Sequence, residues 1–270
     1  MNIAKLLAIT ITLSLGFCHS LPGLEIIGPN LRESNIPLGG RFEGEIKIGN
    51  NEDRDINVKV YLTDYRFQAD GSTEFPQPGT NPRSNAAWME LDGDQFVIST
   101  KTNAIVHYRG VVPRNGLRGT YWSVVMVEGV EPIVSPLAAV GATVRQIGIR
   151  TTIRHAIQII TEIGEPEPVT LKVKKPFLTR MGTNAPIYEM EVANPGDWMI
   201  WPDVSMQLFD VTGTPKEKLS AQKIHLFPGC SHRYRFSTAG LTAGKYDALI
   251  MFDAGKDSLT GARYEIVVPK

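Results

Sequence analysis

The chain has 270 residues, and its 28 lysine and arginine residues balance its 28 aspartate and glutamate residues, so the formal net charge is zero. Proteins that bind nucleic acid or an anionic membrane surface carry a surplus of basic residues. A net charge of zero therefore argues against either partner. A hydrophobic fraction of 42% is too high for a disordered chain, and two cysteines cannot make a disulfide scaffold. Length alone allows one large domain or two smaller ones.

Residues 1–20 have the pattern of a secretory signal peptide. Lys5 supplies a positive charge ahead of an apolar stretch at 6–16, which is shorter than the roughly 20 residues that span a bilayer. We expect cleavage just before Leu21 and no membrane span in the remaining chain. The sequence therefore predicts an exported, periplasmic protein, with a secreted or cell-surface protein as the alternative.

The two cysteines differ in what they predict. Cys18 allows a lipid-anchored N-terminus, although the bulky Phe17 stands where that processing prefers a small residue. If Cys18 leaves with the signal peptide, Cys230 is the only remaining thiol and no internal disulfide can form. We therefore expect Cys230 to be a structural residue.

Apolar and polar residues alternate with period two along most of the chain, which is typical of strands with one buried face. In the first half we expect strands at 42–48, 56–62, 88–91, 96–99, 104–112 and 121–127. In the second half we expect strands at 169–173, 187–193, 204–210, 224–226, 234–236, 246–252 and 264–268. Short polar turns separate these strands, and no window shows a helical apolar stripe. The pattern predicts an all-β fold with two immunoglobulin-like β-sandwich domains in tandem.

The Glu-Pro-Glu-Pro segment at 165–168 is the best candidate linker. It predicts a signal peptide at 1–20, a first domain at 21–163 and a second sandwich at 164–270. Both parts have an ordinary domain size.

The segment 147–163 is the most informative part of the chain. Isoleucine, threonine and histidine fill its odd positions, and as one strand it would extend roughly 56 Å, whereas typical strands have about 5–6 residues. An ordinary last strand with one buried face is one interpretation. The other is an open edge whose apolar row pairs with a partner by β-augmentation, or with a second copy of the chain.

The segment 112–122 has a proline, a short polar turn and an aromatic pair that opens an apolar strand, and Trp88-Met89-Glu90-Leu91 precedes a short strand. In these two motifs the chain resembles the periplasmic pilus-assembly, or fimbrial, chaperones. The resemblance covers most of residues 24–163; in the second half it extends only to another sandwich of similar length. It implies two sandwiches in an L shape with no chemistry of their own, a loop at 131–146 and a long seventh strand at 147–163.

The resemblance also implies a binding site for a pilus or surface protein subunit. In that family the seventh strand is lent to the subunit, and a basic residue there and an arginine of the first strand hold the subunit's terminal carboxylate. Arg154 matches the seventh-strand position best, Arg150 is the next candidate, and Arg32 is the nearest first-strand arginine. The isoleucines expected to contact the subunit are Ile149, Ile153 and Ile157. A solvated strand face is the alternative role for the arginines.

Other candidate sites are weaker. Trp198 and Trp201 on an exposed loop could stack on sugar rings of a glycan in a cell-surface adhesion module, and burial at the sandwich end is the alternative. His225, Cys230 and His232 lack the four-ligand spacing of structural zinc, so we expect a strand end there and no metal. Nucleophile-elbow, metalloprotease and phosphate-loop motifs do not occur, which predicts a non-enzymatic protein without cofactors.

Overall fold

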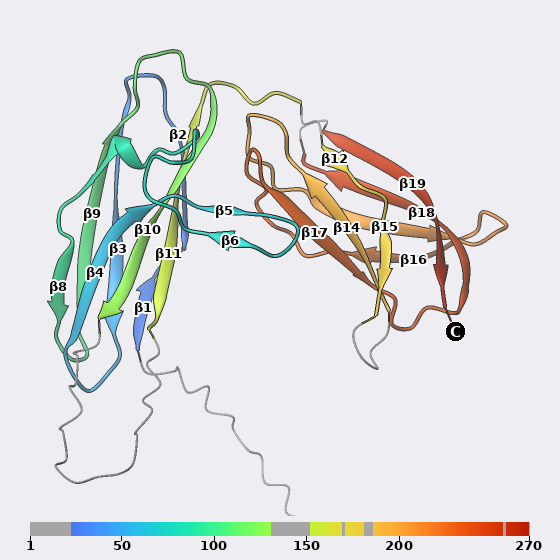
Figure 1. Ribbon diagram of the computed structural model, residues 1–270, viewed down its shortest axis with the longest axis horizontal. Helices are drawn as coiled ribbons and strands as arrows, with labels where there is room; N and C mark the ends of the chain where they lie inside the picture. Colours follow the sequence, from blue (N-terminus) through green and yellow to red (C-terminus); the bar gives the residue numbers. More distant parts are fainter. Residues whose placement is uncertain (1–22, 131–151, 169–170, 181–185, 256–257, 270) are drawn as a thin grey trace, which may run out of the picture.

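The computed structural model describes residues 23–130, 152–168, 171–180, 186–255 and 258–269. The predicted signal peptide, the predicted loop at 131–146 and the beginning of the predicted long strand lie outside these residues. Apart from one 3-10 turn, η1 (Ala86–Trp88), the elements described are β-strands. They form two immunoglobulin-like β-sandwiches in tandem, so the predicted fold class is confirmed (Figure 1). The boundary at residue 163 stays a prediction, and we call the two pairs of sheets the first and second sandwich.

The first sandwich packs a four-stranded sheet against a five-stranded sheet. The four-stranded sheet runs in the order β1 (Leu24–Ile27), β3 (Arg41–Asn50), β9 (Asn103–Val111), β7 (Met89–Leu91). The five-stranded sheet runs in the order β2 (Leu31–Asn35), β11 (Arg154–Ile163), β10 (Gly119–Val130), β4 (Ile56–Thr63), β8 (Gln95–Ile98). β10 explains the continuous apolar run at 121–127, because this central strand is buried on both faces.

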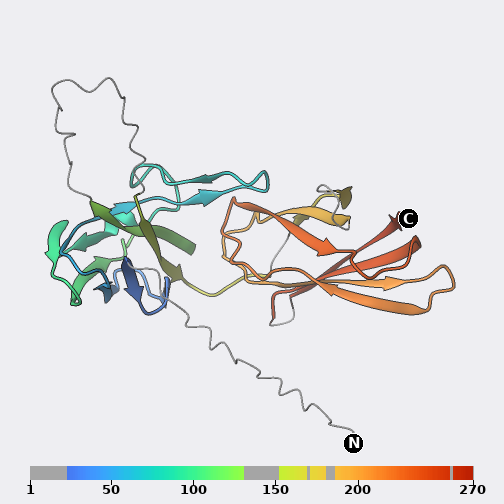
Figure 2. The same cartoon turned by 90° about the horizontal axis from the view of Figure 1, so that it is seen from below.

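A small hairpin leaves the first sandwich and extends toward the second. Its strands are β5 (Arg66–Phe67) and β6 (Thr73–Glu74), and Asp70-Gly71 lies in the turn between them. Both views show it bridging the space between the sandwiches (Figures 1 and 2). At its tip the Ala69 amide donates to Ser231 Oγ at 2.9 Å, and Ser231 Oγ donates to Gln68 Oε1 at 2.6 Å. The hairpin therefore fastens the two sandwiches to each other.

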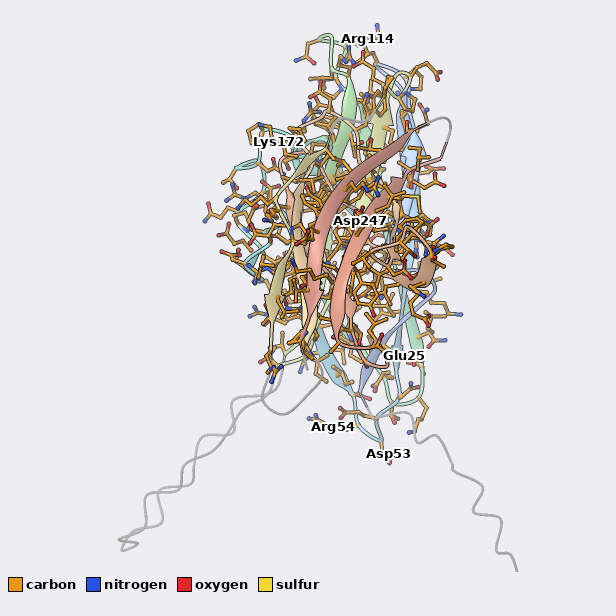
Figure 3. The ribbon with its side chains drawn as sticks, turned by 90° about the vertical axis from the view of Figure 1, so that its right-hand side faces the viewer. Glu25, Asp53, Arg54, Arg114, Lys172 and Asp247 are labelled. Atoms are coloured by element: carbon orange, nitrogen blue, oxygen red, sulfur yellow. The ribbon has the colours of Figure 1, made fainter. Side chains whose placement is uncertain are left out.

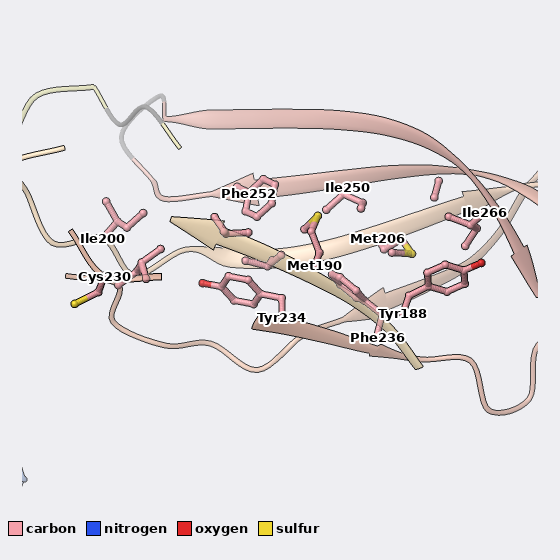
Figure 4. Close-up of a cluster of buried hydrophobic side chains, with 14 of the residues drawn as sticks. Tyr188, Met190, Ile200, Met206, Cys230, Tyr234, Phe236, Ile250, Phe252 and Ile266 are labelled. Atoms are coloured by element: carbon pink, nitrogen blue, oxygen red, sulfur yellow. The ribbon is translucent and has the colours of Figure 1, made fainter. Parts of the chain in front are cut away.

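The second sandwich repeats the plan with two four-stranded sheets. In one sheet β14 (Ile187–Ala193) is central, with β12 (Lys172–Val173) and β13 (Phe177–Thr179) on one side and β17 (Ser231–Ser237) on the other. The other sheet runs in the order β16 (Pro215–Ser220), β15 (Asp203–Phe209), β18 (Gly244–Asp253), β19 (Leu259–Val268). Inward side chains of the two sheets meet in one apolar core, as Figure 4 shows for Met190 and Tyr234 facing Met206 and Phe252.

In the second half one predicted strand was wrong, and two strands, β13 and β16, were missed. Residues 224–226 form no strand, and Leu226 makes a single bridge to Ile200. β16 was missed because its sequence, Pro-Lys-Glu-Lys-Leu-Ser, is exposed and carries no apolar alternation. An edge strand that buries neither face leaves no hydrophobic pattern by which to find it.

In each sandwich, one buried asparagine side chain forms the same set of hydrogen bonds with backbone groups around a turn. The Asn50 side-chain amide donates to the Arg54 and Ile98 carbonyls, and its oxygen accepts from the Glu52 amide. Asn194 repeats this pattern with the carbonyls of Trp198 and Leu226 and the amide of Gly196. Both asparagines are fully buried, so each satisfies backbone groups that water cannot reach.

The two sandwiches share an apolar contact. Trp122 and Ile160 leave the face of the first sandwich and join the core of the second. The Trp122 indole stacks on Phe227 with centroids 4.7 Å apart, and its Nε1 donates to the Tyr65 carbonyl at 2.8 Å. We conclude that buried apolar side chains of the described residues help to hold the sandwiches together. Among these residues no helix is long and apolar enough to cross a membrane.

Gly119 lies where the two backbones come closest. Its φ is +90°, and a Cβ there would overlap the carbonyl oxygen of Asp197, which accepts the Thr120 amide at 2.8 Å. We expect Gly119→Ala to lower the free energy of unfolding by about 3 kcal/mol, because it adds backbone strain and forces the sandwiches apart. Urea unfolding measures the loss. Gly116→Ala is the matched control, since Gly116 also has a positive φ but open space around it, and it should cost about 1 kcal/mol. Equal losses in the two variants would contradict the close contact.

Candidate binding site at the open edge of strand β11

The N-terminal chain changes sheet at residues 28–30, and this change leaves part of β11 without a neighbour. β1 pairs with β3 in one sheet, and β2 then pairs in parallel with residues 158–162 of β11 in the other. Among the described residues, no strand pairs with 154–157 on the side opposite β10. The first half of β11 is therefore an edge, and the second half is covered.

The backbone groups on this edge can be assigned from two hydrogen bonds. The Gln158 amide donates to the Asn30 carbonyl at 2.8 Å, so the even residues of β11 direct their N–H and C=O groups away from β10. The Gly129 amide donates to the Ile153 carbonyl at 3.2 Å, so the odd residues face β10. Arg154 and Ala156 consequently direct their backbone groups to the open side, where an added strand would pair with them.

The predicted isoleucine row divides between the core and the surface. Ile157 is fully buried in the first sandwich, as is the following Ile159, so neither is available to a partner. Ile153 stands at the end of this core with 47% of its side chain exposed. Between them the His155 ring nitrogen contacts the Leu24 carbonyl oxygen at 2.8 Å. Ile149 lies outside the described residues.

The predicted arginines do not come together. Arg154 forms an ion pair with Glu128, with Nε 3.0 Å from the carboxylate, and the Tyr61 hydroxyl donates to the same group at 2.9 Å. Arg32 donates to the Pro29 carbonyl, and its register partner is Ile159, about 17 Å along the strand from Arg154. Arg150 lies outside the described residues. The described residues therefore do not form a basic pair around one carboxylate.

A cleft of about 600 Å³ lies between the two sandwiches, next to the paired half of β11. From β11 it is lined by Gln158, whose Oε1 is buried without a partner, and its other walls carry Leu31, Tyr65, Phe67 and Phe227. Among the described residues that line it, none is a lysine, arginine, aspartate or glutamate. The residue that β11 presents to the cleft is thus a neutral amide, which the sequence analysis missed.

Two histidines complete the cleft wall. Burial lowers the pKa of both His225 and His232, and the nearby Lys223 and Arg235 lower them further. Cys230, between them in sequence, is buried, and burial raises the pKa of its thiol. Within the described residues, no group of three potential ligands that could hold a metal ion is found.

The two tryptophans proposed for glycan contact occupy different environments. Trp198 is 5% exposed and lies beside the interface, so Trp201, at 52%, is the exposed member of this pair. The Trp201 ring stacks on His225 with centroids 4.6 Å apart, and Lys223 Nζ lies 4.4 Å from its centroid. Trp198 is therefore not available to a sugar ring, whereas a glycan contact at Trp201 stays a prediction.

Comparison with known proteins gives likenesses in structure alone. No family model matches the sequence, and no curated protein matches it. Similar solved structures include a chain from the chaperone–tip adhesin complex of CFA/I fimbriae, with 11% identity, a TM-score of 0.48 and coverage of 92% of this chain and 100% of that chain. The class 5 fimbriae chaperone CfaA has 11% identity and a TM-score of 0.46 over 89% of this chain and 98% of its own. The E. coli chaperone DraB has 13% identity and a TM-score of 0.40 over 91% and 98%.

Proposed function

We propose that this protein is a non-enzymatic, exported binding protein that caps a pilus or surface protein subunit by lending it strand β11, as pilus-assembly chaperones do. One observation carries the proposal: the chain changes sheet before β2, so residues 154–157 keep an open edge while 158–162 are paired. An edge of this kind binds an extended strand through main-chain hydrogen bonds.

The side chains along this edge suit such a partner. The odd row that fills the core of the first sandwich at Ile157 reaches the surface at Ile153, and the sequence continues it to Ile149 and Ile147. Apolar residues beyond the end of one core can complete the core of a bound subunit. An exposed apolar edge is an aggregation hazard unless a partner covers it, which favours a binding role over a bare edge.

In this proposal Arg154 does not hold the terminal carboxylate of the subunit, as the resemblance had led us to expect. Arg154 is held by Glu128 and lies away from the cleft, so it positions the edge strand through an ion pair on its outer face. Arg150 and Ile149 remain candidates for subunit contact, since both precede the described part of the strand. The periplasm is the proposed location, because the predicted signal peptide directs export.

Replacing Ile153 with aspartate should weaken binding of a purified pilus or surface subunit at least about ten-fold, because burying that isoleucine contributes roughly 1.5–3 kcal/mol. Isothermal calorimetry measures the affinity. Val97→Asp is the matched control, since Val97 is 58% exposed on β8, at the opposite edge of the same sheet. It should leave the affinity unchanged.

Hydrogen exchange locates the contact independently of the substitutions. Bound subunit should protect the amides of Arg154 and Ala156, which face the open side, while the amides of β8 exchange as before. Subunit binding without protection at 154–157, or an equal loss in the Ile153 and Val97 variants, would contradict strand donation.

A further inference from the structure

Strand β19 is the least protected sheet edge in the described part of the chain. Apart from the open part of β11 at 154–157, the other edge strands have seven residues or fewer; β17 carries Arg233 and Arg235, and β16 begins with Pro215 and carries two lysines. Proteins usually protect edges by short length, proline or lysine. β19 has ten residues and contains neither proline nor lysine. It is therefore suited to pairing with another strand.

One end of this edge is closed by a side chain from the opposite sheet. The Val267 amide donates to the Tyr188 hydroxyl at 2.8 Å, and that hydroxyl donates to the Val267 carbonyl at 2.6 Å. The backbone groups of Val267 thus point away from β18, and by alternation those of Arg263 and Glu265 do so too. In the described residues no strand covers them. A ladder can form over residues 262–266 and ends where Tyr188 takes the place of a partner.

Two carboxylates of β18 and β19 stand opposite each other, and each has one basic partner within the same sheet. Glu265 stands directly opposite Asp247 in the register, and like charges in opposed positions are destabilising. Arg263 reaches Asp247 diagonally with Nε at 2.8 Å, and Lys245 reaches Glu265 at 3.6 Å. Figure 3 labels Asp247 on this outer face of the sheet. On its other flank, the open edge, no opposite charge among the described residues pairs with Glu265.

We propose that two copies of this protein pair antiparallel along β19, about a two-fold axis at Tyr264. This register places Arg263 of each copy opposite Glu265 of the other. The dimer therefore contains two equivalent arginine–glutamate pairs, one on the open flank of each Glu265. It also sets the large Ile266 against the small Ala262 of the second copy. A register centred on Ala262 would instead bring the two Arg263 side chains diagonally together, which the charges disfavour.

This interface is small, so the dimer is weak and concentration-dependent. It is separate from the open edge of β11 and does not depend on the proposed function. Because β11 stays free, each copy in the pair can hold a subunit of its own.

Sedimentation velocity of the full chain without its predicted signal peptide, over a range of concentrations, tests the proposal. Arg263→Glu and Glu265→Arg should each weaken the association about ten-fold, because each places like charges opposite one another at both ends of the ladder. Combining the two exchanges should restore association to within about three-fold of the native chain. Circular dichroism checks that all variants stay folded.

Lys218→Glu on β16 is the matched control, since it makes the same charge change on the other edge of this sheet and should have no effect. A native chain that stays monomeric at every concentration would overturn the proposal. A dimer that persists in both Arg263→Glu and Glu265→Arg would also overturn it. A dimer that is lost in Ile153→Asp would overturn it too, because the contact would then lie at β11.

Discussion

Replacing Trp122 with alanine should lower the free energy of unfolding by about 4 kcal/mol and separate the unfolding of the two sandwiches. Trp122 is 1% exposed and belongs to β10 of the first sandwich, yet its ring packs in the core of the second. Its loss removes the stack on Phe227 and the hydrogen bond to the Tyr65 carbonyl, and leaves a cavity at the interface. Without this contact, the unfolding of one sandwich is less strongly coupled to the unfolding of the other.

Calorimetry and urea unfolding followed by near-ultraviolet circular dichroism measure this effect. The single unfolding transition should become two. The second sandwich should unfold first, because its core has lost the Trp122 ring that packs against it. Trp201→Ala is the control, because that indole is half exposed and its removal should cost no more than about 0.5 kcal/mol. A single transition with a loss below about 1 kcal/mol would show that the apolar contact does not couple the sandwiches.

Asp64→Ala should cost about 3 kcal/mol, because it removes several hydrogen bonds to a fully buried carboxylate and leaves the buried Asn81 amide without its acceptor. The Asp64 side chain is fully buried at the end of β4. Its carboxylate accepts hydrogen bonds from the amides of Gly79 at 3.2 Å and Asn81 at 2.6 Å and from the hydroxyls of Thr80 and Ser84. These bonds hold the irregular segment after β6 against the sheet, so their loss releases that segment as well.

Asp210→Ala is the matched control for Asp64. Asp210 also accepts several bonds, including the amides of Thr212 and Thr214, but within an exposed turn whose donors can pair with water. Its removal should cost less than about 1 kcal/mol by urea unfolding. Equal losses at the two positions would mean that burial of the carboxylate adds nothing.

The regular strands were within reach of sequence analysis wherever one face is buried. β14 has the predicted bounds, 187–193, because its alternation reports the core of its own sandwich. β1, β2 and β16 left no such signal, since each is short or largely exposed. The hairpin strands β5 and β6 were also missed, because each has two residues and only Phe67 of β5 packs against the core of the second sandwich.

The candidate site, too, could be predicted from the sequence only in part. The alternation of 147–163 indicated a strand with an apolar row, and the structure describes its second part as β11. Whether a given isoleucine on that row is buried depends on where the core of the first sandwich ends, and this falls between Ile157 and Ile153. The residue that meets the cleft is Gln158, because the cleft is made by segments far away in sequence, such as Tyr65 and Phe227.

By itself, the sequence determined the all-β class, the tandem sandwiches and the expectation of export, because period two, turn residues and a leading apolar stretch are local properties. The tertiary structure alone decided which half of β11 is open, which residue faces the cleft and how the hairpin joins the sandwiches. Those features depend on strand register and on contacts such as that between Gln68 and Ser231. No local pattern encodes contacts between residues so far apart, since each arises only when both sandwiches have folded and packed.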